Sequence, residues 1–231
     1  MNILITGTSS GLGYELAKQF RAKGDTVYSI SRSKSDLDIK QSQCDLGDLP
    51  SIIPTLEKLI DISSFDIVIL NAGQLGELKK CNELSIKQFN NIFNVNVLAN
   101  KVIIDWLLNN NITVKNIMGI STGAATKPYF GWSLYCTTKS AFKQLISSYA
   151  LENPKIHFIS LAPGVIKTKM QEYITSIDED KIPSVKKFKD MFDDMDSPDI
   201  VAERIIHYIP HLKNIPSGDH YDLRNMINKT L

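Results

Sequence analysis

Cysteine is scarce in this sequence, and its positive and negative charges nearly cancel. Only Cys44, Cys81 and Cys136 occur, no two of them form a Cys-x-x-Cys pair, and their odd number argues against a disulfide scaffold. With 26 Lys and Arg against 25 Asp and Glu, the net charge is +1, which gives no electrostatic reason to bind nucleic acid or an anionic membrane. These features favour a reduced, cytoplasmic protein.

Long apolar runs and sets of metal ligands are lacking as well. No apolar stretch reaches the roughly 20 residues of a membrane helix, and no signal peptide is expected because strand-like residues begin at Asn2. His207 and His211 are spaced like metal ligands, but Pro210 lies between them and no acidic partner is placed. We therefore expect neither a metal site nor a membrane segment.

Apolar residues are plentiful in short runs. They make up 43% of the chain, enough for one large core, and 231 residues suit a single domain over 1–231. The apolar patterns predict strands at 2–5, 26–31, 41–44, 66–70, 115–121 and 156–161, and helices at 13–23, 50–62, 85–109, 134–151 and 197–209. This alternation predicts an α/β fold with a doubly wound parallel sheet of Rossmann type.

A glycine-rich turn follows the first predicted strand. It reads TGTSSGLG over residues 6–13, and helical spacing then continues to Lys23 before Gly24. Strand, turn and helix in this order are the context of a dinucleotide-binding turn, in which N–H groups at the helix start face a pyrophosphate. The spacing is Gly-x-x-x-Gly-x-Gly rather than Gly-x-Gly-x-x-Gly, and an ordinary strand-to-helix loop is the alternative.

Tyr135 and Lys139 lie four residues apart in a predicted helix, so they share one face. A positive charge close to a phenol stabilises the phenolate and lowers the tyrosine pKa from its usual value of about 10. Such a tyrosine can give or take a proton near neutral pH. Taken alone, such a pair is more often a surface contact, and the glycine turn is what favours a catalytic role.

The stretch 170–196 is polar and rich in Lys and Asp. It follows the last strand predicted above, and open α/β sheets bind ligands at the carboxyl ends of their strands. We interpret it as a substrate lid. A solvated insertion is the alternative.

At this point the chain resembles the short-chain dehydrogenase/reductase superfamily over essentially its whole length. Each shared motif is modest alone, but their order and spacing are specific. The motifs are Thr6-Gly-x-x-x-Gly-x-Gly13, Asn71-Ala72-Gly73, Asn94-Val95-Asn96, Ile120-Ser121-Thr122, Tyr135-x-x-x-Lys139 and Pro163-Gly164 through Thr168.

The resemblance implies roles for the catalytic residues. Tyr135 is expected to protonate a carbonyl oxygen, and Lys139 to lower its pKa and hold the nicotinamide ribose. The family's serine, thirteen residues before the tyrosine, is replaced by Thr122, so the hydroxyl that binds the carbonyl comes from Thr122 or from Ser121. Asn96 matches the asparagine that holds a proton-relay water.

The resemblance also implies a cofactor site. Here the second predicted strand ends at Ser31-Arg32 without the carboxylate that would bind the 2′-hydroxyl of NAD, and Arg32 can pair with a 2′-phosphate. NADP(H) is therefore favoured, with a plain surface charge as the alternative for Arg32. The further expected contacts are Gly7, Ser9, Ser10, Gly11, Leu12, Gly13, Asp45, Leu46, Asn71, Ala72, Gly73, Tyr135, Lys139, Pro163, Gly164, Ile166 and Thr168.

Two stretches are similar to sepiapterin reductases and bacterial benzil reductases. They are residues 131–136, GWSLYC, and residues 217–222, SGDHYD. This similarity makes Trp132 and Asp222 candidate substrate contacts, with Asp222 in the place of a pterin-binding aspartate. A residue that only closes the last strand is the alternative for Asp222.

These features together predict an NADPH-dependent carbonyl reductase acting on a ketone, a diketone or a pterin-like carbonyl. A catalytically silent NADP(H)-binding sensor or scaffold is the alternative, and Ser31-Arg32 disfavours NAD-dependent alcohol oxidation. We also expect a homodimer or homotetramer through the helices at 85–109 and 134–151, because their apolar residues occupy more than one face. Those residues are Ile92, Phe93, Val97, Ile103, Ile104, Leu107, Phe142, Leu145, Ile146 and Tyr149.

Overall fold

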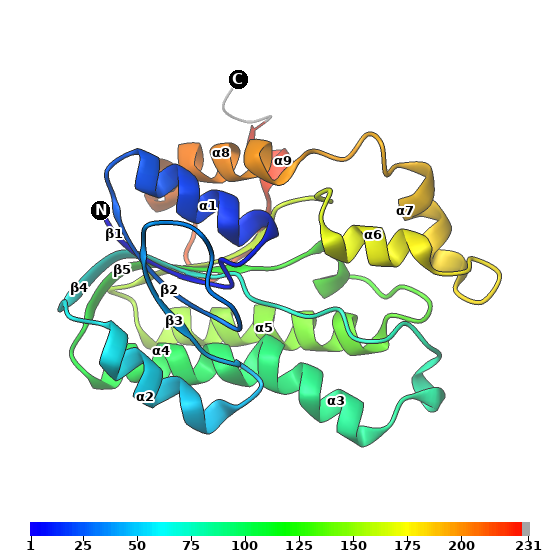
Figure 1. The fold of residues 1–231 in the computed structure, drawn as a ribbon, viewed down its shortest axis with the longest axis horizontal. Coiled ribbons are helices and arrows are strands. Elements are labelled where there is room, and N and C mark those ends of the chain that lie inside the picture. The colour runs from blue at the N-terminus through cyan, green and yellow to red at the C-terminus, as the bar shows by residue number, and fades with distance from the viewer. Residues whose placement is uncertain (228–231) are drawn as a thin grey trace.

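A computed structural model describes residues 1–227 of the chain. Its centre is one parallel sheet of seven strands in the order β3-β2-β1-β4-β5-β6-β7 (Figure 1). The strands are β1 Asn2–Thr6, β2 Thr26–Ser31, β3 Lys40–Gln43, β4 Ser64–Leu70, β5 Thr113–Ile120, β6 His157–Ala162 and β7 His220–Asp222. The predicted doubly wound α/β fold is confirmed.

Helices cover both faces of the sheet (Figure 1). On one face lie α1 Gly11–Ala22 and α8 Pro198–Tyr208, and on the other lie α2 Leu49–Leu59, α4 Ala99–Asn109 and α5 Ser133–Glu152. The remaining helices are α3 Ile86–Phe93, α6 Lys169–Ser176, α7 Lys186–Asp190 and α9 Leu223–Ile227, with a π-helical segment Asn94–Leu98 and 3₁₀ turns Cys81–Glu83, Gly123–Ala125, Pro183–Val185 and Ile209–Asn214.

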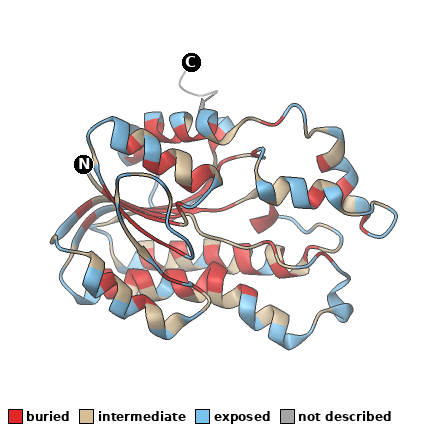
Figure 2. Cartoon of the chain, in the orientation of Figure 1, coloured by how far each residue is buried: buried red, intermediate tan, exposed pale blue. Residues whose placement is uncertain are grey.

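Successive side chains of each strand point to opposite faces of the sheet, so the strands contribute to two cores, one on each face (Figure 2). In β1, Ile3 and Ile5 pack with α1 and α8, while Leu4 packs with the opposite layer. A third, smaller core lies under α6 and α7, where Ile174 and Phe188 pack against Trp132. The segment 170–196 is therefore packed on the body of the protein rather than free in solvent.

The predicted helix over 85–109 is continuous in space but changes its hydrogen-bonding at 94–98 to the wider π form. The strand β7 and the short helices α6, α7 and α9 were not predicted as such. None of the helices that the structure describes is long and apolar enough to cross a membrane.

The apolar residues from which a homo-oligomer was inferred are largely used within one chain. Ile103, Ile104, Leu107, Phe142 and Ile146 are completely buried, because α4 and α5 pack on the sheet and against neighbouring helices. None of the large exposed hydrophobic side chains among the described residues belongs to the predicted interface set. The apolar surplus is thus explained by packing in the monomer, and the oligomer stays a prediction without that support.

Candidate active site

One cavity of about 760 Å³ lies at the carboxyl ends of the strands. This volume is within the range of small-molecule and cofactor sites. Every site residue predicted from the sequence lines it except Gly13 and Asn96. The turns after β1, β2, β4, β5 and β6 converge on it, as expected for a parallel sheet.

The glycine turn after β1 brings three segments into close contact. A side chain at Gly13 would lie 2.2 Å from the Gly7 carbonyl oxygen and 2.4 Å from Asn71 Nδ2, so only glycine fits there. Gly13 therefore does not line the cavity but lets α1 begin against the turn. Gly7 itself has a φ of 78°, a conformation that favours glycine.

The start of α1 can receive an anion. Ser10, the residue that caps it, makes no side-chain bond to the first backbone N–H groups, and the first turn contains no acidic residue. A helix N-terminus without a side-chain cap or an acidic residue attracts phosphate through its free N–H groups and the helix dipole. The structure thus fits the pyrophosphate of a dinucleotide at this point.

Asn71 holds the turn in place from β4. Its Nδ2 donates to the carbonyl oxygens of Thr6 and Gly7 at 3.0 and 3.1 Å, and its backbone N–H donates to Thr6 Oγ1 at 3.0 Å. The Ala72 N–H donates to the same Thr6 oxygen at 3.0 Å. Asn71 therefore has a structural role in addition to lining the cavity.

Arg32 marks the end of the cavity where the adenine ribose is expected. It is exposed, lines the cavity and forms no ion pair with another described residue. Asp38, in the loop after β2, is bound by Arg21 at 2.7 Å and does not line the cavity. Asp45 and Leu46 lie beside Arg32 in the lining, at the end of β3.

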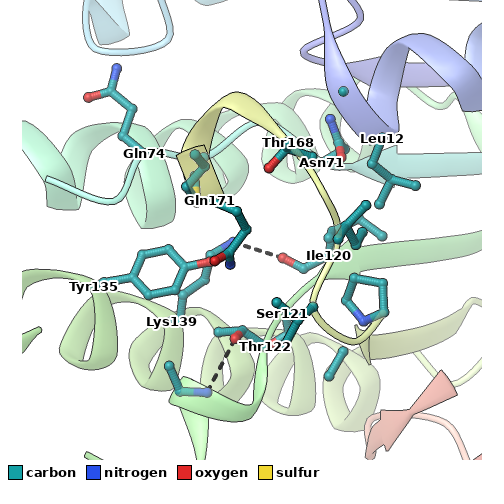
Figure 3. A pocket seen from close by; sticks show the side chains of 18 of the residues that line it. Leu12, Asn71, Gln74, Ile120, Ser121, Thr122, Tyr135, Lys139, Thr168 and Gln171 are labelled. Atoms are coloured by element: carbon teal, nitrogen blue, oxygen red, sulfur yellow. Dashed lines mark hydrogen bonds between the residues drawn. The ribbon is translucent and has the colours of Figure 1, made fainter. Parts of the chain in front are cut away.

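Tyr135 and Lys139 face the cavity from α5, and both are shifted toward their neutral forms. Burial raises the pKa of Tyr135 to about 12 and lowers the pKa of Lys139 to about 8. Lys139 Nζ donates to the Ile120 carbonyl at 2.8 Å and lies 5.9 Å from the Tyr135 ring centroid (Figure 3). Burial raises the tyrosine pKa, opposite to the lowering expected from Lys139, whose ammonium group is directed at a carbonyl.

The two candidate hydroxyls differ in their surroundings. The Thr122 side chain interacts with the phenol and opposes the rise of the Tyr135 pKa. Its Oγ1 also accepts from the Ala124 N–H at 3.2 Å (Figure 3). Ser121 Oγ is buried and has no hydrogen-bond partner among the described residues. Thr122 thus interacts with the tyrosine, while the choice between the two hydroxyls as the partner of the carbonyl stays a prediction.

Asn96 lies behind the cavity in the π-helical segment. It is completely buried, its Oδ1 accepts from the Gln74 N–H at 2.8 Å, and its Nδ2 donates to the Gln74 carbonyl at 2.8 Å and to Thr138 Oγ1 at 3.0 Å. The asparagine thereby ties the loop after β4 to α5. Its proposed contact to a relay water stays a prediction.

Trp132 connects the start of α5 to the segment 170–196. Its Nε1 donates to Ser184 Oγ at 2.8 Å, and its ring stacks on Phe188 at 5.0 Å between centroids. The same ring meets the Tyr135 ring edge to face at 6.2 Å. Trp132 lines the cavity, but its polar atom is already engaged, so it can offer substrate only an apolar surface.

Asp222 ends β7 at the rim of the cavity. Its carboxylate accepts three hydrogen bonds from Arg224: from the backbone N–H at 3.0 Å, from Nε at 2.9 Å and from Nη2 at 2.5 Å. Arg224 also lowers the pKa of this carboxyl. The residue both closes the strand and lines the cavity, and a substrate would meet an ion pair there rather than a free carboxylate.

Several lining residues were not found from the sequence. Gln171 and Met170 come from α6, Phe188 from α7 and Arg224 from α9. For α6 a signal was present, because Thr168 is a residue type that starts helices and Gln171 is one turn beyond it. For Arg224 the sequence held no signal, because a single arginine near a short strand forms no motif with a recognisable spacing.

Comparisons with known proteins agree with the motifs. A family model described as short chain dehydrogenase matches residues 1–179. The chain is 28% identical over 242 residues to a benzil reductase ((S)-benzoin forming) of Bacillus subtilis, covering 97% of this chain and 98% of the relative. It is 27% identical over 216 residues to the sepiapterin reductase of Meriones unguiculatus, covering 80% of this chain and 82% of that relative. The solved structure of the KRED1-Pglu enzyme matches with a TM-score of 0.84 at 24% identity, covering 96% of this chain and 100% of that one.

Proposed function

The chain belongs to the short-chain dehydrogenase family, and from this membership we propose that it is an NADPH-dependent carbonyl reductase acting on ketones or diketones. The observation that carries the proposal is the convergence of Tyr135, Lys139 and Thr122 on the cavity that begins at the uncapped end of α1. The similarity to a relative named benzil reductase over nearly the whole chain favours a diketone. The ion pair on Asp222 makes a pterin the less favoured substrate.

The residues present fit a dinucleotide. The N-terminus of α1 would hold the pyrophosphate, Arg32 the 2′-phosphate, Asp45 and Leu46 the adenine, and Lys139 the nicotinamide ribose. When bound, the nicotinamide supplies the hydride for the carbonyl carbon.

The chain itself supplies the proton and the electrostatic environment. Because its pKa is raised to about 12, Tyr135 is protonated at neutral pH and can donate from Oη to the carbonyl oxygen. The Thr122 hydroxyl lies beside the phenol and can stabilise the charge that develops on that oxygen. The Lys139 ammonium places a positive charge near the phenolate that remains. The site is thus prepared for reduction, which consumes a proton.

Tyr135→Phe tests the proposal. Oxidation of NADPH with benzil should fall by at least about 10², the usual contribution of a general acid, while NADPH binding followed by fluorescence should be nearly unchanged. Activity that survives within a few-fold would reject the Tyr–Lys mechanism. If the wild type binds NADPH but turns over no diketone, pterin or quinone, the silent sensor becomes the better hypothesis.

Arg32→Asp tests the cofactor. The substitution removes the partner of the 2′-phosphate and adds an acceptor for the ribose hydroxyl, so the kcat/KM ratio of NADPH to NADH should fall. An unchanged ratio would show that Arg32 does not read the 2′-phosphate. Lys155→Asp, also an exposed cation replaced by an anion, but outside the cavity lining, is the matched control.

A further inference from the structure

Gln171 extends from α6 into the cavity, toward Tyr135 and Lys139 (Figure 3). Ile174, three residues later on the same face, is completely buried, whereas Tyr173 is 46% exposed and does not line the cavity. The helical repeat therefore fixes Gln171 on the inner face of α6.

The Oε1 atom of Gln171 is buried and accepts no hydrogen bond from any described residue. Buried polar atoms are almost always paired, and an unpaired one destabilises the fold. Lys139 Nζ, a strong donor in the same cavity, is directed instead at the Ile120 carbonyl at 2.8 Å. The acceptor is thus aimed into the reaction site without a partner from the protein.

We propose that Gln171 Oε1 accepts a hydrogen bond from the substrate, from a hydroxyl on the carbon next to the reacting carbonyl. The inference rests on the proposed function, because it takes Tyr135 as the proton donor to the carbonyl oxygen. If the carbonyl oxygen lies at Tyr135, the carbon next to the carbonyl is the part of the substrate that can reach Gln171, which extends toward Tyr135 (Figure 3). Among monoketones, the site then selects α-hydroxy ketones over ketones without such a donor.

The carboxamide N–H of the cofactor is a second group that could donate a hydrogen bond to Gln171 Oε1. The two sources separate experimentally, because a contact to the cofactor affects every substrate equally and changes the affinity for NADPH. A contact to the substrate changes only the compounds that carry the hydroxyl.

The test compares 2-hydroxyacetophenone with 2-methoxyacetophenone, which keep the same ring, carbonyl and second oxygen but differ in the donor. We expect the wild type to prefer the hydroxy ketone by roughly tenfold in kcat/KM, as is usual for one hydrogen bond to an otherwise unpaired group. Gln171→Met keeps the length of the side chain, removes the acceptor and should bring the ratio close to one. Gln171→Glu keeps an acceptor and should retain the preference.

Tyr173→Met, on the outer face of the same helix and outside the cavity lining, is the matched control and should keep the wild-type ratio. Calorimetry with the NADP⁺ complex measures the affinity for 2-hydroxyacetophenone without turnover, and that affinity should fall in Gln171→Met. If the wild type binds the hydroxy ketone in a Gln171-dependent way but reduces no ketone, the proposed reaction fails and the contact stands.

Three results would overturn the inference. The first is a ratio near one in the wild type. The second is an equal loss for both ketones in Gln171→Met together with weaker NADPH binding, which assigns the amide to the cofactor. The third is an equal loss of kcat/KM for both ketones in Gln171→Met, with a lowered melting temperature and unchanged NADPH affinity. This result would assign the Gln171 amide a role in packing.

Discussion

Desolvation favours the neutral form of both candidate catalytic side chains of α5, Tyr135 and Lys139. It keeps the Tyr135 phenol protonated, and it makes the Lys139 ammonium easier to deprotonate. For a reductase the first effect is useful, since the acid form is the one needed. The second effect is a cost to folding, because a charge is held where water cannot reach it.

Lys139→Met should therefore raise stability while it lowers activity. The pKa of Lys139 is about 8 in the folded chain and about 10.4 when unfolded, so the folded state holds fewer protons between these values and wild-type stability rises with pH across that window. At pH 7 the variant should gain about 1 kcal/mol in urea unfolding, because the loss of the bond to Ile120 offsets part of the relief. Above pH 10 the gain should vanish.

Reduction of the ketone by Lys139→Met should fall by at least about tenfold, since the charge beside the phenolate is gone. Lys155→Met, at an exposed position, is the control and should show neither effect. A variant less stable than the wild type at both pH values would show that the bond to Ile120 outweighs the buried charge.

Thr122 and Ser121 can be separated by substitution. Thr122→Ala should lose about 10²–10³ in kcat, the range of an oxyanion donor, whereas Ser121→Ala should lose much less. Thr122→Ser keeps the hydroxyl and the bond to Ala124, and should recover most of the activity. A larger loss from Ser121→Ala would place the other hydroxyl on the carbonyl.

At the scale of elements, the sequence predicted what long periodic patterns can show. The strands β1, β2, β4, β5 and β6 are apolar runs, and α1, α5 and α8 carry clear helical spacing, so their positions were found within a few residues. The helices α6 and α7 were missed because they are short and polar, and their few apolar residues find partners in segments distant in the sequence, such as Leu75 and Trp132. The three residues of β7 are too few for a pattern, so its pairing with β6 became visible only in the structure.

The same limit applies to the site. Tyr135, Lys139 and the glycine turn could be found because their chemistry requires fixed spacing. Gln171 was missed although Thr168 offered a helix start, and Arg224 could not be found, because tertiary packing alone sets the place of its segment at the cavity. The tyrosine pKa was predicted in the wrong direction, because the sequence shows the neighbouring charge but not the burial.

We propose that α6 and α7 act as a substrate lid, anchored by Phe188 on Trp132. Phe188→Ala removes a stacked ring that is 6% exposed, so the lid should close less well and the KM for the ketone should rise by roughly tenfold. NADPH affinity should change little. Phe130→Ala, at a position that is 49% exposed, is the control. An unchanged KM with lowered stability would make the segment a structural insertion.

At the scale of the whole molecule, a homodimer or homotetramer through α4 and α5 remains our proposal. The completely buried residues of α4 and α5 cannot form that interface, so it would have to use the partly exposed ones, such as Val102 and Leu145. Light scattering during gel filtration should give a mass at least twice 25.9 kDa. A clean monomer at tens of micromolar would exclude the interface, and Leu145→Lys should dissociate it if it exists.

The central position of β1 has a consequence for how the protein is made. Ile3 pairs with Val27 on one side and with Ile67 on the other, so β1 must wait for β4, which is synthesised later, before it is enclosed. Parallel strands that pair across a long stretch of sequence give a high contact order. A high contact order slows folding and leaves apolar strands exposed to solvent until the pairing forms. We expect slow refolding, with early collapse around β1 and β2, and a need for chaperones during rapid synthesis.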